Sequence, residues 1–151
     1  MDAKALRSAT FTLHRYYMWA NRMRVHMEEK LPTYSEQLKR DKNDIWTTEG
    51  IETFMYMSYW YSGLYVVIEG WRALKLSDPN VDSLLSVTKN VELLKKYRNG
   101  VYHYQKNYFD NRFMNLMTKG QNIVEWVRNL NLAFGGYFLN LPRPKAKEQT
   151  P

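Results

Sequence analysis

Apolar residues recur at steps of three and four along most of the chain, which is the spacing of amphipathic α-helices. In the first such stretch, residues 3–31, they are Leu6, Ala9, Leu13, Tyr16, Ala20, Met23, Met27 and Leu31. Pro32 is expected to end this helix, because proline lacks an N–H and clashes with the preceding turn. Residues 33–48 are polar and of mixed charge, so we expect a connection there. No stretch shows the alternation of a β-strand, and the pattern therefore predicts an all-α protein.

A second helix is expected to start near Thr48 as its N-cap, with Glu49 and Glu52 in the first turn, where the helix dipole favours anions. Its expected core stripe is Phe54, Met57, Tyr61, Leu64, Ile68 and Trp71, and its more polar flank is Ser58, Ser62, Tyr65, Glu69 and Arg72. Residues 53–68 contain no charge. The run is too short for a membrane span and contains serines, tyrosines and a tryptophan, so we interpret it as a buried helix.

Further elements follow in the second half of the chain. Asp78-Pro79 pairs an N-cap acceptor with a proline at the first helical position and predicts a short turn. A third helix, with Val87, Val91 and Leu94, leads into residues 98–103. The final helix is expected to begin at Thr118, with Gln121 completing a capping box. Its stripe is Ile123, Val127, Leu130, Phe134, Tyr137 or Phe138, and Leu141; Gly135-Gly136 either permits a close helix contact or ends this helix early.

Four long amphipathic helices with short connections predict an up-and-down four-helix bundle with short extra helical turns. We expect one domain over residues 1–141, followed by a disordered basic tail over residues 142–151. The start of the sequence shows no secretory pattern, so we expect a cytoplasmic protein that does not engage a membrane.

The net charge of the chain indicates the kind of partner that it could bind. The 151 residues include 22 Lys+Arg and 15 Asp+Glu, for a net charge of +7. Such a chain suits an anionic partner, of which nucleic acid is the commonest, although solvated basic faces are also common. Cysteine is absent from the sequence, which excludes a disulfide scaffold, a cysteine-ligated metal and a thiol nucleophile.

The candidate chemistry is concentrated in one segment. The three histidines, His14, His26 and His103, match no zinc pattern, and neither a glycine-rich phosphate loop nor a nucleophile elbow is present, so no metal or cofactor is expected. What remains is Arg98-Asn99-Gly100-Val101-Tyr102-His103. An arginine fork matches phosphate oxygens, and histidine titrates near neutral pH. Together they could cleave RNA without a metal: the imidazole moves the proton of a ribose 2′-hydroxyl or of the leaving 5′-oxygen, and the guanidinium stabilises the charge on phosphorus.

The spacing of Arg98 and His103 limits how their side chains could meet. Residues five apart on an ideal helix diverge by about 140°. Either Gly100 breaks or distorts the helix, or the pair from one chain meets its copy across a dimer. The alternative for His103 is a hydrogen-bonded residue at a helix end.

The segment resembles the motif of the HEPN superfamily (higher eukaryotes and prokaryotes nucleotide-binding), a group of small α-helical bundle domains. Members carry an Arg, four to six further residues and a His at the end of the third main helix, often with a polar residue directly after the Arg. Arg98, Asn99 and His103 match this pattern. The resemblance covers residues 5–140 in helix order and is specific over these six residues.

The resemblance implies a metal-independent endoribonuclease of the toxin, antiphage or RNA-processing type, with Arg98 and His103 catalytic, Asn99 orienting them, and a homodimer cleft. It also implies an acidic residue on the preceding long helix, for which Glu69 is the match; the alternative for Glu69 is an intrahelical partner of Arg72. A subgroup of toxins continues as Arg-x4-His-x-Tyr and works with an antitoxin or nucleotidyltransferase partner. Gln105 stands at that tyrosine position here.

Beside the motif, Tyr102, Tyr104 and Lys106 are expected to contact an RNA substrate, since unpaired bases stack on aromatic rings. Two other interpretations stay open. In the first, the HEPN-like domain binds a nucleotide or a protein partner without catalysis. In the second, the bundle only assembles with partner helices, which would require a large exposed apolar patch.

Overall fold

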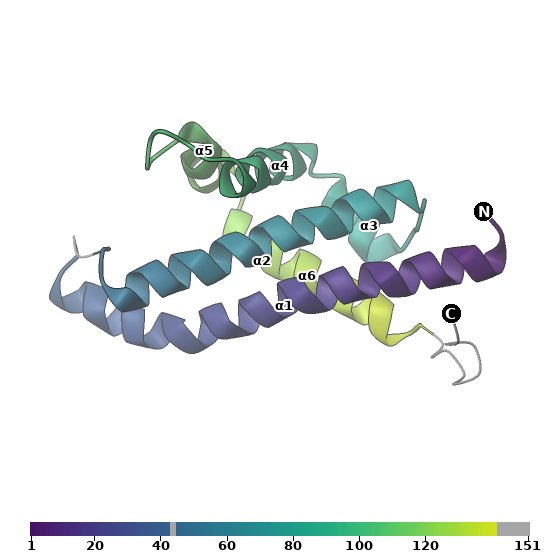
Figure 1. Cartoon of the computed structure of the whole chain (residues 1–151), viewed down its shortest axis with the longest axis horizontal. Helices are drawn as coiled ribbons and strands as arrows, with labels where there is room; N and C mark the ends of the chain where they lie inside the picture. Colours follow the sequence, from purple (N-terminus) through teal and green to yellow (C-terminus); the bar gives the residue numbers. More distant parts are fainter. Residues whose placement is uncertain (43–44, 142–151) are drawn as a thin grey trace.

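The computed structural model describes residues 1–42 and 45–141, and in these residues the chain forms six helices and no strand (Figure 1). They are α1 (Ala3–Arg40), α2 (Thr48–Ala73), α3 (Pro79–Leu85), α4 (Thr88–Tyr102), α5 (Asn111–Lys119) and α6 (Ile123–Leu139). The expected all-α class is confirmed. The expected basic tail, residues 142–151, lies outside the described residues.

The two longest helices, α1 and α2, lie side by side as an antiparallel pair (Figure 1). Small residues allow the close contact. A Cβ atom added at Gly63 would lie 2.9 Å from the Cβ of Ala20, and one added at Gly70 would lie 2.3 Å from Leu13 Cδ1. Ala20 and Leu13 are seven residues apart, as are Gly63 and Gly70, so the two contacts repeat at the heptad spacing of packed helices.

Helix α2 is the centre of the molecule. It contacts α1 on one side and α4 on the other, α5 packs beside α4, and α6 crosses behind the α1–α2 pair (Figure 1). One cluster of buried apolar residues draws on all six helices, with Trp60, Trp71 and Phe134 among its largest members. No helix in the described part of the chain combines the length and apolar content that crossing a membrane requires.

The expected end of the first helix at Pro32 is wrong, because α1 continues through this proline to Arg40. Residues 33–40 therefore belong to a helix and not to a connection. Pro32 is exposed, so water can hydrate the Glu28 carbonyl that lacks its usual N–H partner. The added turns bury Tyr34 against Phe54 of α2, with ring centroids 6.2 Å apart. Packing against α2 thus outweighs the local cost of proline.

Helix α2 departs from the expectation in two details. Its N-cap is Thr47 instead of Thr48, and the Thr47 hydroxyl accepts a hydrogen bond from the Gly50 N–H at 3.2 Å. Phe54 of the expected core stripe is 44% exposed, whereas Ser62 and Tyr65 of the expected polar flank are buried. Because α2 is covered by α1 and by α4, it buries more than one stripe. The other stripe residues are buried or half-buried as expected.

The last third of the chain differs most from the helices that the sequence predicts. Thr118 does not start the final helix; it lies in the last turn of α5, and its hydroxyl donates to the Met114 carbonyl at 2.9 Å. Thr118 and Gln121 therefore form no capping box, and α6 begins at Ile123. Most of the expected α6 stripe is buried. Gly135 permits a close contact, since an added Cβ would lie 2.5 Å from the Tyr17 hydroxyl, and the helix runs on to Leu139.

Candidate functional site

Helix α4 carries the first part of the Arg/His motif and is anchored to α2 by Tyr97. This side chain is buried, and its hydroxyl shares a 2.8 Å hydrogen bond with Ser58 of α2. Burial raises the pKa of the Tyr97 hydroxyl above its ordinary value, against a smaller opposing effect of the Ser58 bond. The inward position of Tyr97 places the next residue, Arg98, at the seam between α4 and α2.

The structure brings Arg98, Asn99 and Glu69 together at this seam. Arg98 Nη1 donates to Asn99 Oδ1 at 3.0 Å, and Arg98 Nη2 lies 3.5 Å from Glu69 Oε2 on α2. The Arg98 Nε atom is buried without a hydrogen-bond partner. The Arg98 side chain is 31% exposed, so the outer part of the guanidinium remains open to an anion. Glu69 thus pairs with Arg98 across the seam.

The charges at the seam influence the pKa of Tyr65, which lies on α2 one turn before Glu69. The pKa of the Tyr65 hydroxyl is raised mainly by burial, then by the carboxylates of Glu69 and Glu92. Arg72 and Arg98 lower it in part. The seam therefore gathers charges of both signs around one buried phenol, and Arg98 belongs to this mixed cluster rather than to a purely basic surface.

Gly100 does not break the helix. Helix α4 continues through it to Tyr102, so the expected distortion is absent. The residue instead admits α5: an added Cβ would lie 3.1 Å from the Arg112 Cβ and 3.1 Å from the Phe113 ring. Glycine at this position serves helix packing, since only a hydrogen in place of a side chain leaves room for α5.

His103 is the C-cap residue of α4, with an extended backbone (φ −123°, ψ 128°). Its N–H donates to the Asn99 carbonyl at 3.1 Å, and its own carbonyl accepts a bond from the Gln105 side chain. The residue is exposed. Helix α4 stays regular from Arg98 to Tyr102, and residues five apart on a regular helix diverge by about 140°. One chain therefore does not bring Arg98 and His103 to a common face.

The expected substrate-contacting residues all lie on the surface near His103. Tyr102 is 55% exposed and Tyr104 is 92% exposed, and Lys106 is exposed as well. Two aromatic residues that the sequence reasoning did not select lie close by. Tyr108 follows in the same loop, and its ring centroid is 4.7 Å from that of Trp46, which precedes α2. Four aromatic residues within residues 102–109 were the signal that could have identified Tyr108.

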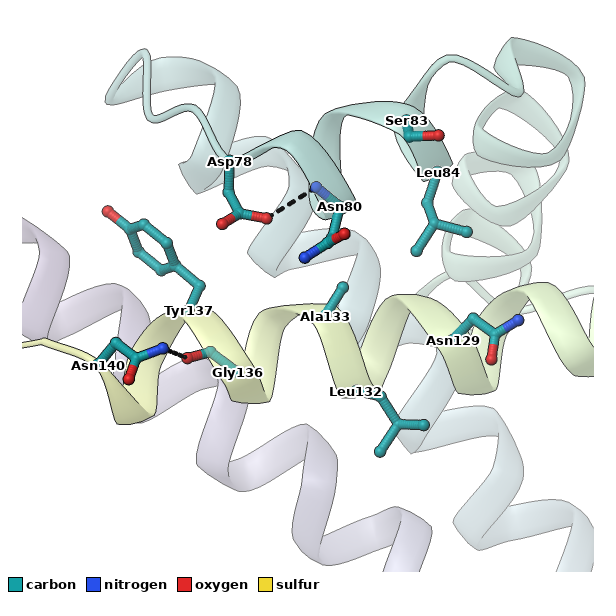
Figure 2. A pocket seen from close by; sticks show the side chains of 10 residues that line it. All are labelled: Asp78, Asn80, Ser83, Leu84, Asn129, Leu132, Ala133, Gly136, Tyr137 and Asn140. Atoms are coloured by element: carbon teal, nitrogen blue, oxygen red, sulfur yellow. Dashed lines mark hydrogen bonds between the residues drawn. The ribbon is translucent and has the colours of Figure 1, made fainter.

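A groove of about 550 Å³ between α3 and α6 lies away from this motif (Figure 2). Two of its polar side chains are engaged in local structure. Asp78 caps α3 by accepting from the Asn80 and Val81 N–H groups, and the Asn140 amide donates to the Gly136 carbonyl. A second groove of about 520 Å³, between α1 and α2, is lined mostly by apolar residues and has Glu69 among its lining. Neither groove presents a pair of acid and base groups.

Within residues 1–42 and 45–141, no three His, Asp or Glu side chains gather in a way that could hold a metal ion. No family model, curated protein or solved structure matches the chain. The HEPN resemblance stands on the six-residue motif and on the order of the helices around it.

Proposed function

We propose that the chain is a HEPN-type four-helix bundle that acts as a metal-independent endoribonuclease in a homodimer. The proposal rests on the orientation and the exposure of the two motif side chains, Arg98 and His103. Arg98 is oriented by Glu69 and Asn99 while staying 31% exposed, and His103 is exposed at the end of the same helix. An oriented guanidinium and an accessible imidazole are the two groups that RNA cleavage without a metal requires.

In the proposed reaction, one His103 imidazole takes the proton of a ribose 2′-hydroxyl, and the resulting oxygen attacks the adjacent phosphorus. The imidazolium formed in this way gives its proton to the leaving 5′-oxygen as the P–O bond breaks. The products are a 2′,3′-cyclic phosphate and a 5′-hydroxyl. Arg98 stabilises the negative charge that builds up on the phosphoryl oxygens. DNA lacks the 2′-hydroxyl and is not cut by this route.

The geometry of α4 supports the proposed homodimer. Arg98 lies at the seam with α2, and His103 is exposed at the C-cap five residues later, a spacing that on a regular helix corresponds to about 140° around the axis. A cleft that contains both groups therefore needs the Arg98 of one copy and the His103 of another. A two-fold dimer supplies this arrangement twice.

The test is cleavage of a labelled single-stranded RNA in EDTA by the wild type, Arg98→Ala and His103→Ala. The wild type should leave 2′,3′-cyclic phosphate ends. Each variant should lose about 100-fold or more in rate, the scale of general acid–base or charge-stabilising groups. His26→Ala, which removes a half-buried histidine of α1, is the matched control and should cut normally.

Thermal unfolding midpoints of His103→Ala and the wild type should agree, because the His103 side chain is exposed. Cleavage by His103→Ala at the wild-type rate would contradict the proposal.

A second candidate function is a non-catalytic module that binds a nucleotide or a protein partner. It is favoured by the engagement of Arg98 with Glu69 and Asn99 of its own chain. A wild type that cuts none of a panel of structured and unstructured RNAs, yet binds ATP in a titration calorimeter and loses this binding in Arg98→Ala, would favour the module.

A further inference from the structure

One surface of the molecule combines exposed aromatic rings with lysines. We call it the aromatic ledge and define it by six residues: Trp46, Lys96, Tyr102, Tyr104, Lys106 and Tyr108. Lys96 and Tyr102 are exposed residues of α4, Tyr104, Lys106 and Tyr108 lie in the loop between α4 and α5, and Trp46 lies at the corner before α2. Figure 1 shows that this loop projects toward the same end of the molecule as the corner between α1 and α2.

The aromatic rings of the ledge are exposed. Trp60, Trp71 and Trp126 are buried, whereas Trp46 is 57% exposed. The Trp46 ring instead packs at 4.7 Å on Tyr108, itself 62% exposed, which ties the corner to the loop. Indole and phenol rings that stand in water with open faces are the side chains on which unpaired bases stack.

The positive charge of the ledge favours an anionic ligand. Among its six residues are two lysines, Lys96 and Lys106, and no Asp or Glu. Lys96 lies on α4, seven residues before His103, which is the C-cap residue of that helix. Lys96 and Lys106 thus stand on either side of His103 in the chain, and both are exposed.

We infer that the aromatic ledge binds single-stranded nucleic acid, with unpaired bases stacked on Trp46, Tyr104 and Tyr108 and phosphates neutralised by Lys96 and Lys106. A protein partner is less favoured, because the ledge has two lysines and no acidic residue among its six members, which suits a regularly charged backbone better than a mixed protein surface. Only the consequence that the ledge delivers an RNA strand to His103 rests on the proposed function.

Binding can be measured without cleavage by using DNA. The probe is a fluorescein-labelled 12-nucleotide oligo(dT), followed by fluorescence anisotropy with the wild type, Trp46→Ala, Tyr104→Ala and Trp19→Ala. Trp19 on α1 is as exposed as Trp46, at 57%, and is the matched control. Trp46→Ala and Tyr104→Ala should each raise Kd about fivefold or more, whereas Trp19→Ala should leave Kd within about twofold. Tyr104 is 92% exposed, so its removal does not threaten folding.

The salt dependence separates ionic from stacking contributions. Lys96→Ala should reduce the slope of log K against log salt by about 0.7, the value for one phosphate contact on a single strand. Tyr104→Ala should weaken binding and leave the slope unchanged. Lys4→Ala, at the far end of α1, is the charge control and should change neither quantity.

Oligo(dT) binding that is unaffected by Trp46→Ala and Tyr104→Ala, or no binding by the wild type at low salt, would overturn the inference. So would a change of oligomeric state in Trp46→Ala, seen by sedimentation, without a change in oligo(dT) affinity, because this result assigns the ledge to a protein contact. These results differ from failure of the proposed function. A chain that binds oligo(dT) through the ledge but cuts no RNA keeps the inference and loses the nuclease.

Discussion

Asp82 illustrates how one side chain joins three parts of the chain. Its carboxylate accepts hydrogen bonds from the Trp71 indole at 3.1 Å, the Ser77 hydroxyl at 2.6 Å and the Asp78 N–H at 3.1 Å. The Ser77 bond is the main cause that lowers the pKa of Asp82 below its ordinary value, and the Trp71 and Asp78 bonds add to it. Desolvation opposes them in part. The ionised form is therefore the one that holds the end of α2 to α3.

The pH dependence of stability follows from the direction of this shift. Because the folded-state pKa of Asp82 is depressed, its contribution is present above the unfolded-state pKa and is lost as the pH falls through the folded-state value. The free energy of unfolding should thus decrease below about pH 4, and Asp82→Asn should flatten this acid limb. Urea unfolding measured from pH 2 to 7 checks this. Asp2→Asn, which removes the charge but keeps an oxygen acceptor at the N-cap of α1, is the control. Equal acid limbs in wild type and Asp82→Asn would be inconsistent with this role.

At the scale of elements, α1 demonstrates how packing extends a helix beyond its local signals. Pro32 removes one backbone hydrogen bond, and yet the turns that follow it gain the burial of Tyr34. A further tie is the ion pair between Lys30 and Glu52 of α2 at 2.5 Å. Lys30 lies just before Pro32 and Tyr34 just after it, so contacts with α2 hold the helix on both sides of the proline.

We expect Pro32→Ala to stabilise the protein by about 1–3 kcal/mol, because alanine restores the N–H and removes the clash with the preceding turn. Pro79 is the matched control. It occupies the first turn of α3, where no intrahelical N–H bond is lost, so Pro79→Ala should change stability by less than about 1 kcal/mol. Chemical denaturation followed by circular dichroism measures both. A destabilised Pro32→Ala would show that α1 depends on the proline itself.

Alanine substitutions at two glycines, Gly63 and Gly136, test how closely the helices pack. At Gly63, an added Cβ would lie 2.9 Å from the Cβ and 3.3 Å from the Cα of Ala20, and the helix backbone of α1 cannot move aside easily. At Gly136, an added Cβ meets nothing within 4 Å. Gly136→Ala should therefore stabilise α6 by about 0.5–1 kcal/mol through helix propensity. Gly63→Ala should destabilise the protein by about 1–3 kcal/mol through overpacking. Equal effects of the two changes on the urea midpoint would show that the α1–α2 contact is loose.

At the scale of the whole molecule, a buried polar network fixes how α6 crosses the α1–α2 pair. The Asn131 amide of α6 donates to Asn21 of α1 at 2.9 Å, and its oxygen accepts from the Trp60 indole of α2 at 3.0 Å. Asn131 is 1% exposed, so each of these bonds replaces water that the site excludes. Three helices are held in one register by one side chain.

The proposed dimer predicts complementation between two inactive variants. Arg98→Ala and His103→Ala should each be inactive alone. When they are mixed after reversible unfolding, half of the dimers contain both chains, and one of the two clefts in each is intact. About a quarter of the wild-type rate should therefore return in the RNA assay. Dimers that form, as seen by sedimentation, without recovered activity would exclude a cleft shared between copies.

The sequence by itself determined the helical class, most of the buried faces of α2 and α6, and the cap of α3. These features depend on near neighbours in the chain: apolar residues at helical spacing, and a cap residue beside its own helix. It also singled out Arg98, Asn99 and His103 as residues, with Glu69 supplied by the HEPN resemblance.

Only the tertiary structure decided the continuation of α1 through Pro32, the separate helix α5, and the role of Gly100 as a contact for that helix. It also joined Asn90 to a distant part of the chain. The buried Asn90 side chain forms two 2.8 Å hydrogen bonds with the backbone of Gln121, thirty-one positions away. Arg98 likewise faces α2 because Tyr97 is buried there. These outcomes depend on which distant surfaces meet, and the free energy gained by burying them exceeds the local preferences that a sequence pattern reports.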